Sequence, residues 1–250
     1  MPRKPRQKSA LNIYHVILRG INKQIIFEDK ADYLQFVNIL MYYKEECNFK
    51  LFAYCLMDNH IHLLVEESDV SLDEIMKRIE VKFVRWYNKK YERIGYLFQD
   101  RYKSEPVNDE KYFLTVLRYI HQNPIHAGLE SELGIYPWNS FHDYVLEDAN
   151  FVDINTAINL FPQYGKCMEF MREISNEKCM EYTSGSRYSD TEALTIIKQK
   201  TSCQSPSDFQ RLNLLERNRY LQMLYSSGLA IRQISRLTGI SRTAINKVVH

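Results

Sequence analysis

Residues 52–67, FAYCLMDNHIHLLVEE, hold two apolar runs around the pair Asp58-Asn59. That pair suits the dihedral angles of a tight turn, so we expect two adjacent antiparallel strands. Side chains two apart in a strand share a face, so His60 and His62 point the same way. Two imidazoles on one face form a bidentate site for a divalent cation, although a pair of partly buried, hydrogen-bonded histidines is the structural alternative.

The segments around this hairpin complete one pattern. Strands are predicted at 12–20, 50–57, 60–67 and 102–107, and amphipathic helices at 29–47, 71–91 and 110–123. The order β-α-β-β-α-β with one helix appended predicts an α+β fold of about 150 residues, a ferredoxin-like antiparallel sheet with helices on one face. Ser71 to Glu74 resembles a capping box, and Asn108 or Asp109 caps the last helix. That helix is expected to stop before Pro124, because the residue before proline disfavours the α region.

The character of the sequence changes after residue 150. Residues 151–183 predict short helices of mixed polarity, and 182–190 has the composition of a linker. Residues 228–250, GLAIRQISRLTGISRTAINKVVH, predict two short helices broken at Gly239, the second capped by Ser241. This pattern is typical of a helix-turn-helix, with plain helical packing as the alternative. We therefore expect a first domain at 1–150, a helical connector at 151–187 and a small all-α helix-turn-helix domain for DNA at 188–250.

The amino-acid composition indicates the general class of protein. Apolar residues at 45% and charged residues at 26% of the 250 describe a globular chain with a core. The five cysteines are never spaced C-x-x-C, which favours reduced thiols over a disulfide framework or a zinc ribbon. No apolar run approaches the ~20 residues needed to cross a bilayer, and no signal-peptide core follows the basic start. A cytoplasmic location is expected.

Positive charge is gathered in three segments. Residues 1–8 carry four Lys or Arg and no acid, 76–93 carry seven against two Glu, and 228–250 carry four and no acid. A single run of charge is usually a solvated face. Three such runs in a chain of net charge +2 favour a polyanion partner, because phosphate neutralisation needs clustered Lys and Arg.

The predicted helix FLTVLRYIHQNP, residues 113–124, carries two polar groups on one face. Tyr119 and Asn123 are four residues apart and so lie one helical turn from each other, whereas His121 falls roughly opposite. A phenol and an amide can therefore face the histidine pair together if this helix packs on that sheet. Each residue alone has an ordinary structural explanation.

These motifs together resemble a known family. HIH within MDNHIHLLV is similar to the histidine–hydrophobe–histidine motif of the HUH endonucleases. With LRYIHQNPIHAGL, YPWNS, YHVILRGINKQIIFED and YLFQDRYKSEPV, it resembles the HUH single-tyrosine transposases, especially the REP-associated tyrosine transposases of bacteria. The resemblance covers residues 10–146. Asp58 departs from the family's usual proline, which puts an acid near the site but changes no ligand.

The resemblance implies a site and a reaction. His60 and His62 match the metal-binding pair, Tyr119 the nucleophile and Asn123 the amide ligand of Mg²⁺ or Mn²⁺. It implies an enzyme that nicks and joins single-stranded or hairpin DNA through a 5′-phosphotyrosine link and a free 3′-hydroxyl. Duplex DNA is expected to bind the C-terminal domain. The oligomeric state, monomer or homodimer, stays open.

Candidate phosphate contacts lie in the basic segments and beside them. They are Arg3, Lys4, Arg6, Lys77, Arg78, Lys82, Arg85, Arg101, Lys103, Arg236, Arg242 and Lys247. Tyr102 and Trp86 are candidates for stacking on bases, and a core position is the alternative for each. Two other functions compete: a DNA-binding regulator that uses the helix-turn-helix without cleavage and, less favoured, a metallohydrolase of small molecules. Cleavage of DNA distinguishes the nicking enzyme from the DNA-binding regulator.

Overall fold

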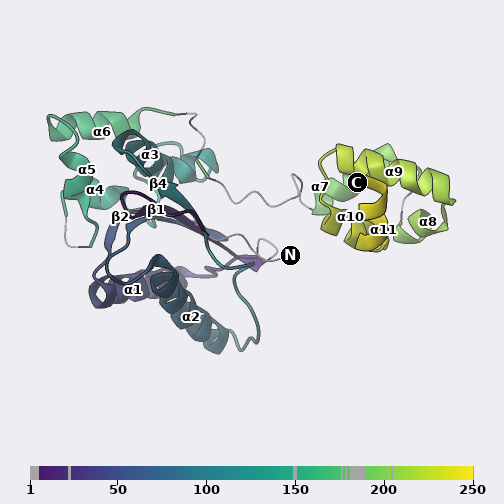
Figure 1. Ribbon diagram of the computed structural model, residues 1–250, viewed down its shortest axis with the longest axis horizontal. Coiled ribbons are helices and arrows are strands. Elements are labelled where there is room, and N and C mark those ends of the chain that lie inside the picture. Colours follow the sequence, from purple (N-terminus) through teal and green to yellow (C-terminus); the bar gives the residue numbers. More distant parts are fainter. Residues whose placement is uncertain are drawn as a thin grey trace. The chain divides into compact units, whose positions relative to one another are not determined.

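The computed structural model describes residues 6–21, 24–148, 151–175, 177, 179–180, 188, 190–203 and 205–249. The chain divides into two compact units, Met1–Tyr182 and Thr183–His250, each with its own hydrophobic cluster. Figure 1 shows the elements of both units. Arg3 and Lys4, together with nearly all of the predicted linker, lie outside the described residues. No described helix is both long and apolar enough to cross a membrane.

The first unit is built on one antiparallel sheet in the order β2-β3-β1-β4. Its strands are β1 (Ile13–Arg19), β2 (Lys50–Leu56), β3 (His60–Glu66) and β4 (Lys103–Val107). The hairpin predicted around Asp58-Asn59 is confirmed, since β2 pairs antiparallel with β3. This strand order is the one expected of the ferredoxin-like split arrangement, so the predicted fold class is confirmed.

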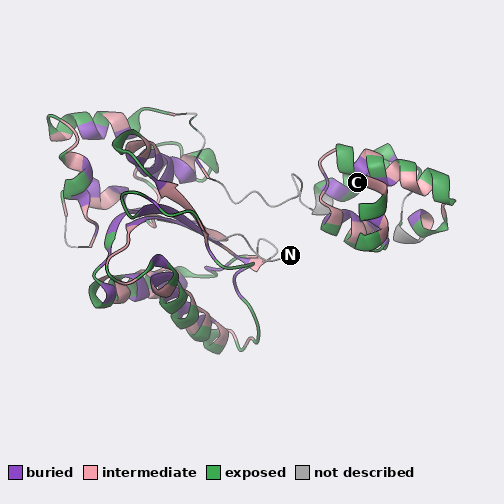
Figure 2. Cartoon of the chain, viewed as in Figure 1, coloured by how far each residue is buried: buried purple, intermediate pink, exposed green. Residues whose placement is uncertain are grey.

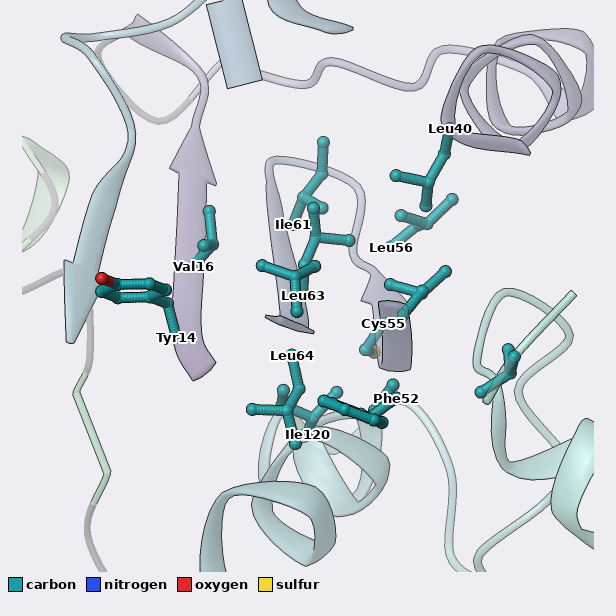
Figure 3. Packing of buried hydrophobic residues seen from close by; sticks show 14 of the residues in the cluster. Tyr14, Val16, Leu40, Phe52, Cys55, Leu56, Ile61, Leu63, Leu64 and Ile120 are labelled. Carbon is teal, nitrogen blue, oxygen red and sulfur yellow. The ribbon is translucent and has the colours of Figure 1, made fainter. Parts of the chain in front are cut away.

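The helices lie on both faces of the sheet, whereas helices on one face were expected. The helices α1 (Lys30–Cys47) and α2 (Leu72–Lys90) pack against each other on one face. The appended helix α3 (Glu110–His126) packs on β2 and β3 from the other face. Figure 3 shows the reason: Ile61 and Leu63 point toward the side of α1, and Leu64 points toward Ile120 of α3. One face of β3 carries Ile61, Leu63 and Val65, and the other carries His62 and Leu64, all of them buried. Both faces are therefore covered, and Figure 2 shows the strands as mostly buried.

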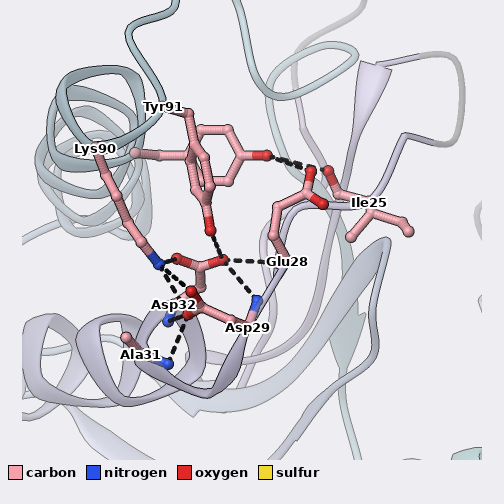
Figure 4. A network of polar contacts seen from close by, with 8 residues as sticks. Ile25, Glu28, Asp29, Ala31, Asp32, Lys90 and Tyr91 are labelled. Atoms are coloured by element: carbon pink, nitrogen blue, oxygen red, sulfur yellow. Dashed lines mark hydrogen bonds and ion pairs between the residues drawn. The ribbon is translucent and has the colours of Figure 1, made fainter.

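Polar contacts fix the end of α2 to the start of α1. The Lys90 ammonium lies 2.6 Å from an oxygen of the fully buried Asp32 carboxylate and 2.8 Å from Asp29 (Figure 4). The Tyr91 hydroxyl donates a hydrogen bond of 2.8 Å to Asp32. Asp29 and Asp32 also form the capping box that begins α1. Because a buried carboxylate is costly without partners, these contacts hold the two helices in one arrangement.

One predicted helix end and one predicted capping box were wrong. Helix α3 continues through Pro124 to His126, since in its last turn the ring only removes one hydrogen-bond donor. Ser71 is the N-cap of α2, but its side chain makes no capping bond. The Glu67 carboxylate accepts from the backbone N–H of Leu72 at 2.7 Å instead. Asp109 caps α3 as predicted, accepting from the N–H of Tyr112.

The expected connector is largely part of the first unit. Buried residues of the main core also come from three short helices, α4 (Phe141–Val145), α5 (Ile154–Ile158) and α6 (Tyr164–Arg172). The buried Arg118 of α3 lies 2.7 Å from the Glu177 carboxylate and covers the ring of Phe170. The Gln122 amide donates to the carbonyl oxygens of Met171 and Glu173 at 2.9 and 2.8 Å. These contacts join the segment to α3, so the unit extends to residue 182.

The second unit is all-helical, as expected. It contains α7 (Asp190–Lys200), α8 (Pro206–Arg211), α9 (Leu214–Ser226), α10 (Ile231–Thr238) and α11 (Arg242–Val249). The predicted break lies at Gly239, whose φ of 74° is the left-handed conformation that glycine adopts readily. The Ser241 hydroxyl accepts from the N–H of Ala244, so the predicted cap of α11 is confirmed.

Candidate active site

The two histidines that begin β3 lie side by side on the face covered by α3. Their ring centroids are 5.0 Å apart. His62 is buried with 2% of its surface exposed, and His60 at the strand end is half-buried. The register places Arg19 opposite His60 and Ile17 opposite His62, so these β1 side chains share the same face.

Each histidine is oriented through its Nδ1 atom. The His60 Nδ1–H donates to the Asn59 side-chain oxygen at 2.7 Å, which leaves Nε2 as the atom with a lone pair. The Nδ1 of His62 lies 3.0 Å from Nε2 of His15, a buried histidine of β1. Metal-binding histidines are commonly held by a hydrogen bond at the second ring nitrogen, so both rings are arranged to offer Nε2.

The site keeps these imidazoles neutral. Burial lowers the pKa of His60 to about 4, with the positive charge of Arg19 acting in the same direction. Burial also lowers the pKa of His62 well below its usual value, helped by His60 and His15. Near pH 7 the ring nitrogens therefore hold lone pairs, the form that binds a cation.

Helix α3 brings the phenol and the amide to the histidines. The Asn123 side-chain nitrogen lies 3.3 Å from Nε2 of His62. The Tyr119 ring centroid lies 5.8 Å from that of His62 and 5.9 Å from that of His15. His121 points the opposite way, as predicted, with Nε2 3.0 Å from the Ser140 hydroxyl. The four residues predicted as the site therefore converge, while His121 belongs to the core.

The donor set fits a divalent cation of the Mg²⁺ or Mn²⁺ type. In the part of the chain that the structure describes, no three His, Cys, Asp or Glu side chains gather around a metal position. A cation here would be held by two neutral imidazoles and the amide of Asn123. This mixed nitrogen and oxygen set suits Mn²⁺ as well as Mg²⁺.

Sequence reasoning missed two residues of this face. His15 and Arg19 lie on β1, a strand that carries no metal-binding motif of its own. Alternation along the strand groups them, but only the pairing with β3 places them at the site. Lys103 of β4 pairs with Ile17, so its side chain lies on the same face. It is the predicted phosphate contact that the strand register places nearest to the histidines.

Most other predicted phosphate contacts of the first unit lie elsewhere. Arg6 forms an ion pair with Asp73 and covers the ring of Tyr102, which is buried and hydrogen-bonded to Asp73 rather than open to a base. The cations of α2 lie on the face opposite α3, where Lys77 and Arg78 are ion-paired with Glu74. The candidates with exposed side chains are Lys77, Arg78, Lys82, Arg85, Arg101, Arg236, Arg242 and Lys247.

Trp86 also differs from its prediction as a platform for a base. It is half-buried and stacks on Phe83 of the core at a centroid distance of 5.9 Å. The Lys90 ammonium lies 5.1 Å from its ring centroid. The core alternative therefore describes Trp86 better.

Comparisons with known proteins find transposases that are similar to this chain. Residues 8–123 match the family model described as "Transposase IS200 like", a range that includes all four site residues. A protein of Haemophilus influenzae assigned as a REP-associated tyrosine transposase is 27% identical over 150 residues, 54% of this chain and 81% of that protein. A solved REP-associated tyrosine transposase bound to a REP hairpin shares the fold, with a TM-score of 0.54 and 15% identity over 76% of this chain and 99% of that one.

Proposed function

We propose that this chain, a relative of the IS200-like and REP-associated tyrosine transposases over its first unit, is a metal-dependent enzyme that nicks and rejoins single-stranded DNA at a hairpin. Transposase activity is the function that the comparisons support. The chemistry assigned to individual residues is our own proposal.

One observation carries the proposal: a tyrosine and an amide from α3 converge on the histidine pair of β3. Tyr119 and Asn123 are one helical turn apart, and Asn123 lies 3.3 Å from His62. A core that served stability alone would not require four such polar groups, from two elements far apart in sequence, to lie together. Phosphodiester cleavage uses this combination, because it needs a nucleophile beside a charge-stabilising site.

His60, His62 and Asn123 would hold the cation. When bound, Mg²⁺ or Mn²⁺ polarises the scissile phosphate and stabilises the charge that develops during cleavage. The protein's own contribution is to keep both imidazoles neutral by burial and to orient them through Asn59 and His15. Arg19 and Lys103 add positive charge on the same face, where a phosphate would lie.

Tyr119 would form the covalent intermediate. Its hydroxyl oxygen attacks the phosphorus and loses its proton to water, while the bond to the 3′ oxygen breaks and that oxygen gains a proton. The product is a 5′-phosphotyrosine and a free 3′-hydroxyl. The phosphotyrosine remains a phosphodiester, so attack by a second 3′-hydroxyl rejoins strands without ATP.

The kind of DNA substrate is inferred from the burial of Tyr119 and from the solved transposase that shares the fold. Only 8% of the surface of Tyr119 is exposed, so a backbone free of its complement reaches it more readily than a duplex does. The solved relative is bound to a REP hairpin. We infer the same class of substrate here, a hairpin with an unpaired flank, and a cytoplasmic location.

The metal assignment is tested by the double variant His60→Ala/His62→Ala. We expect nicking of a labelled hairpin in Mn²⁺ to be lost, while binding of the same hairpin is largely kept, because phosphate contacts supply most of the affinity. The control is His121→Gln, which changes a buried histidine of the same unit outside the site. Nicking by the double variant under excess chelator would contradict the assignment.

A further inference from the structure

The last turn of α3 brings a further imidazole to the proposed nucleophile. The ring centroid of His126 lies 6.1 Å from that of Tyr119. The two residues are seven positions apart, so together with Asn123 they form one stripe along the helix. Because α3 continues through Pro124 to His126, this imidazole lies on the helix face that carries the site.

The backbone that follows α3 closes this turn. The N–H of Gly128 donates to the carbonyl of Ile125 at 2.9 Å, and the N–H of Leu129 donates to the carbonyl of Pro124 at 2.9 Å. Gly128 has a φ of 71°, the left-handed conformation that this kind of helix ending requires. Two backbone hydrogen bonds therefore fix the turn from which His126 reaches back toward Tyr119.

The side chains of Tyr119 and His126 lean toward each other. An α-helix rises about 1.5 Å per residue, so positions seven apart are separated by about 10.5 Å along its axis. The ring centroids are much closer, at 6.1 Å. The hydroxyl lies at the end of the tyrosine ring farthest from the backbone, so this lean brings it toward the imidazole. A group that accepts a proton must lie within a hydrogen bond or one water of it, and this arrangement suits that range.

In the described part of the chain, three imidazoles lie beside the Tyr119 ring, and two of them have other partners. The centroids of His15 and His62 are 5.9 and 5.8 Å from that of Tyr119. In the proposed site His62 offers Nε2 to the cation and donates its Nδ1–H to His15, so neither ring keeps a lone pair for the phenol. His126 is exposed, so its imidazole can take up a proton and release it to solvent.

We propose that His126 is the general base for Tyr119. As the phenol oxygen attacks phosphorus, its proton passes through one water to a ring nitrogen of His126. The bond from phosphorus to the 3′ oxygen breaks, and that oxygen takes a proton from water. When strands are rejoined, the imidazolium returns its proton to the Tyr119 oxygen as the phosphotyrosine bond breaks, and the attacking 3′-hydroxyl loses its proton to water. The proposal rests on the proposed function, because it assigns a proton acceptor to the nucleophile named there.

The test measures single-turnover nicking of a labelled hairpin by the full chain in Mn²⁺, and binding of the same hairpin in chelator. His126→Ala should slow nicking by about 100-fold or more and leave binding nearly unchanged, because the base acts only during the reaction. Added imidazole should restore part of the rate, since it can enter the exposed position that the variant vacates. The control is His142→Ala, which removes a half-buried histidine of α4 and should nick normally with or without imidazole.

Two further measurements distinguish a base from other roles of His126. His126→Arg keeps a cation for a phosphate but cannot accept a proton, so it should be as slow as His126→Ala. A substrate with sulfur in place of the 3′ oxygen at the cut has a leaving group that needs no proton. Both variants should stay slow on this substrate, because the base acts on the attacking oxygen.

Three results would overturn the proposal: normal nicking by His126→Arg, recovery of the variants on the sulfur substrate, or no rescue of His126→Ala by imidazole. Failure of the proposed function is distinguishable from all three. It would appear as absent nicking by the wild-type protein, whereas failure of the present proposal leaves wild-type nicking intact.

Discussion

The Nε2 atom of His15 lies 3.0 Å from the Nδ1 atom of His62, inside the sheet face that α3 covers. Their rings are nearly parallel, with centroids 5.3 Å apart. For His62 to offer Nε2 to a cation, its Nδ1 must carry the proton and donate it to His15. His15 thereby selects the form of His62 that binds metal, although it is not itself placed as a ligand.

Replacing His15 tests this positioning role. His15→Phe removes the acceptor and keeps a ring of similar size, so we expect the Mn²⁺ concentration for half-maximal nicking to rise about 10- to 100-fold. His15→Gln places a polar group near the former Nε2 and should restore part of the affinity. A purely structural role predicts an equal effect of both variants on melting temperature and no change in the metal requirement.

Arg19 is predicted to contact the DNA backbone beside His60. Arg19→Gln should weaken hairpin binding and lower the slope of log affinity against log salt by about one phosphate contact. The matched control is Arg78→Gln, which removes an exposed arginine on α2 that is ion-paired with Glu74. Equal salt slopes for the two variants would contradict a phosphate contact at Arg19.

The stability of the first unit should fall in acid because of its buried histidines. Burial lowers the pKa of His121 from 6.5 to about 3, so between these values the unfolded chain binds a proton that the folded chain does not. The contribution of this histidine is complete above pH 6.5 and is lost as pH falls toward 3, at up to about 1.4 kcal/mol per pH unit. Urea unfolding between pH 7.5 and 5 should therefore show a shallower pH dependence for His121→Gln than for wild type. Identical dependence would mean that His121 titrates normally in the fold.

The local parts of the site could be predicted from the sequence. Alternation places His60 and His62 on one face, and four-residue spacing places Tyr119 beside Asn123, because both follow from backbone geometry alone. His15 could not be found this way, since its role depends on the register between β1 and β3. The face that α3 covers depends likewise on which side of the sheet α1 and α2 leave open.

Tertiary contacts also explain the errors at element ends. Glu67 replaces Ser71 as the acceptor at the start of α2 because the preceding strand brings its carboxylate to the N–H of Leu72. The segment after residue 150 was expected to be a connector, because its short helices have mixed polarity. Their packing depends on Arg118 and Gln122, two polar residues of α3 that gave no sign of that contact in the sequence.

The second unit should be separable from the first. A chain ending at Tyr182 keeps the whole main core, so we expect it to fold and to nick a single-stranded hairpin. Full-length protein should bind duplex DNA more tightly than this truncated form, and Arg242→Ala/Lys247→Ala should remove most of that difference. Equal duplex binding by the full and truncated chains would leave the pair α10 and α11 without a role in DNA binding.

Tyr119 is proposed to form a covalent bond to DNA, and the variant Tyr119→Phe isolates that role. The change removes one oxygen, so a structural tyrosine would tolerate it at about 1 kcal/mol, whereas a nucleophile cannot be replaced. The control is Tyr112→Phe, on the same helix, where the hydroxyl donates to Glu105 at 2.6 Å. Wild type and Tyr112→Phe, incubated with Mn²⁺ and a hairpin labelled at either end, should attach covalently to the fragment downstream of the cut. Tyr119→Phe should give neither adduct nor nick, and normal cutting by this variant would contradict the account.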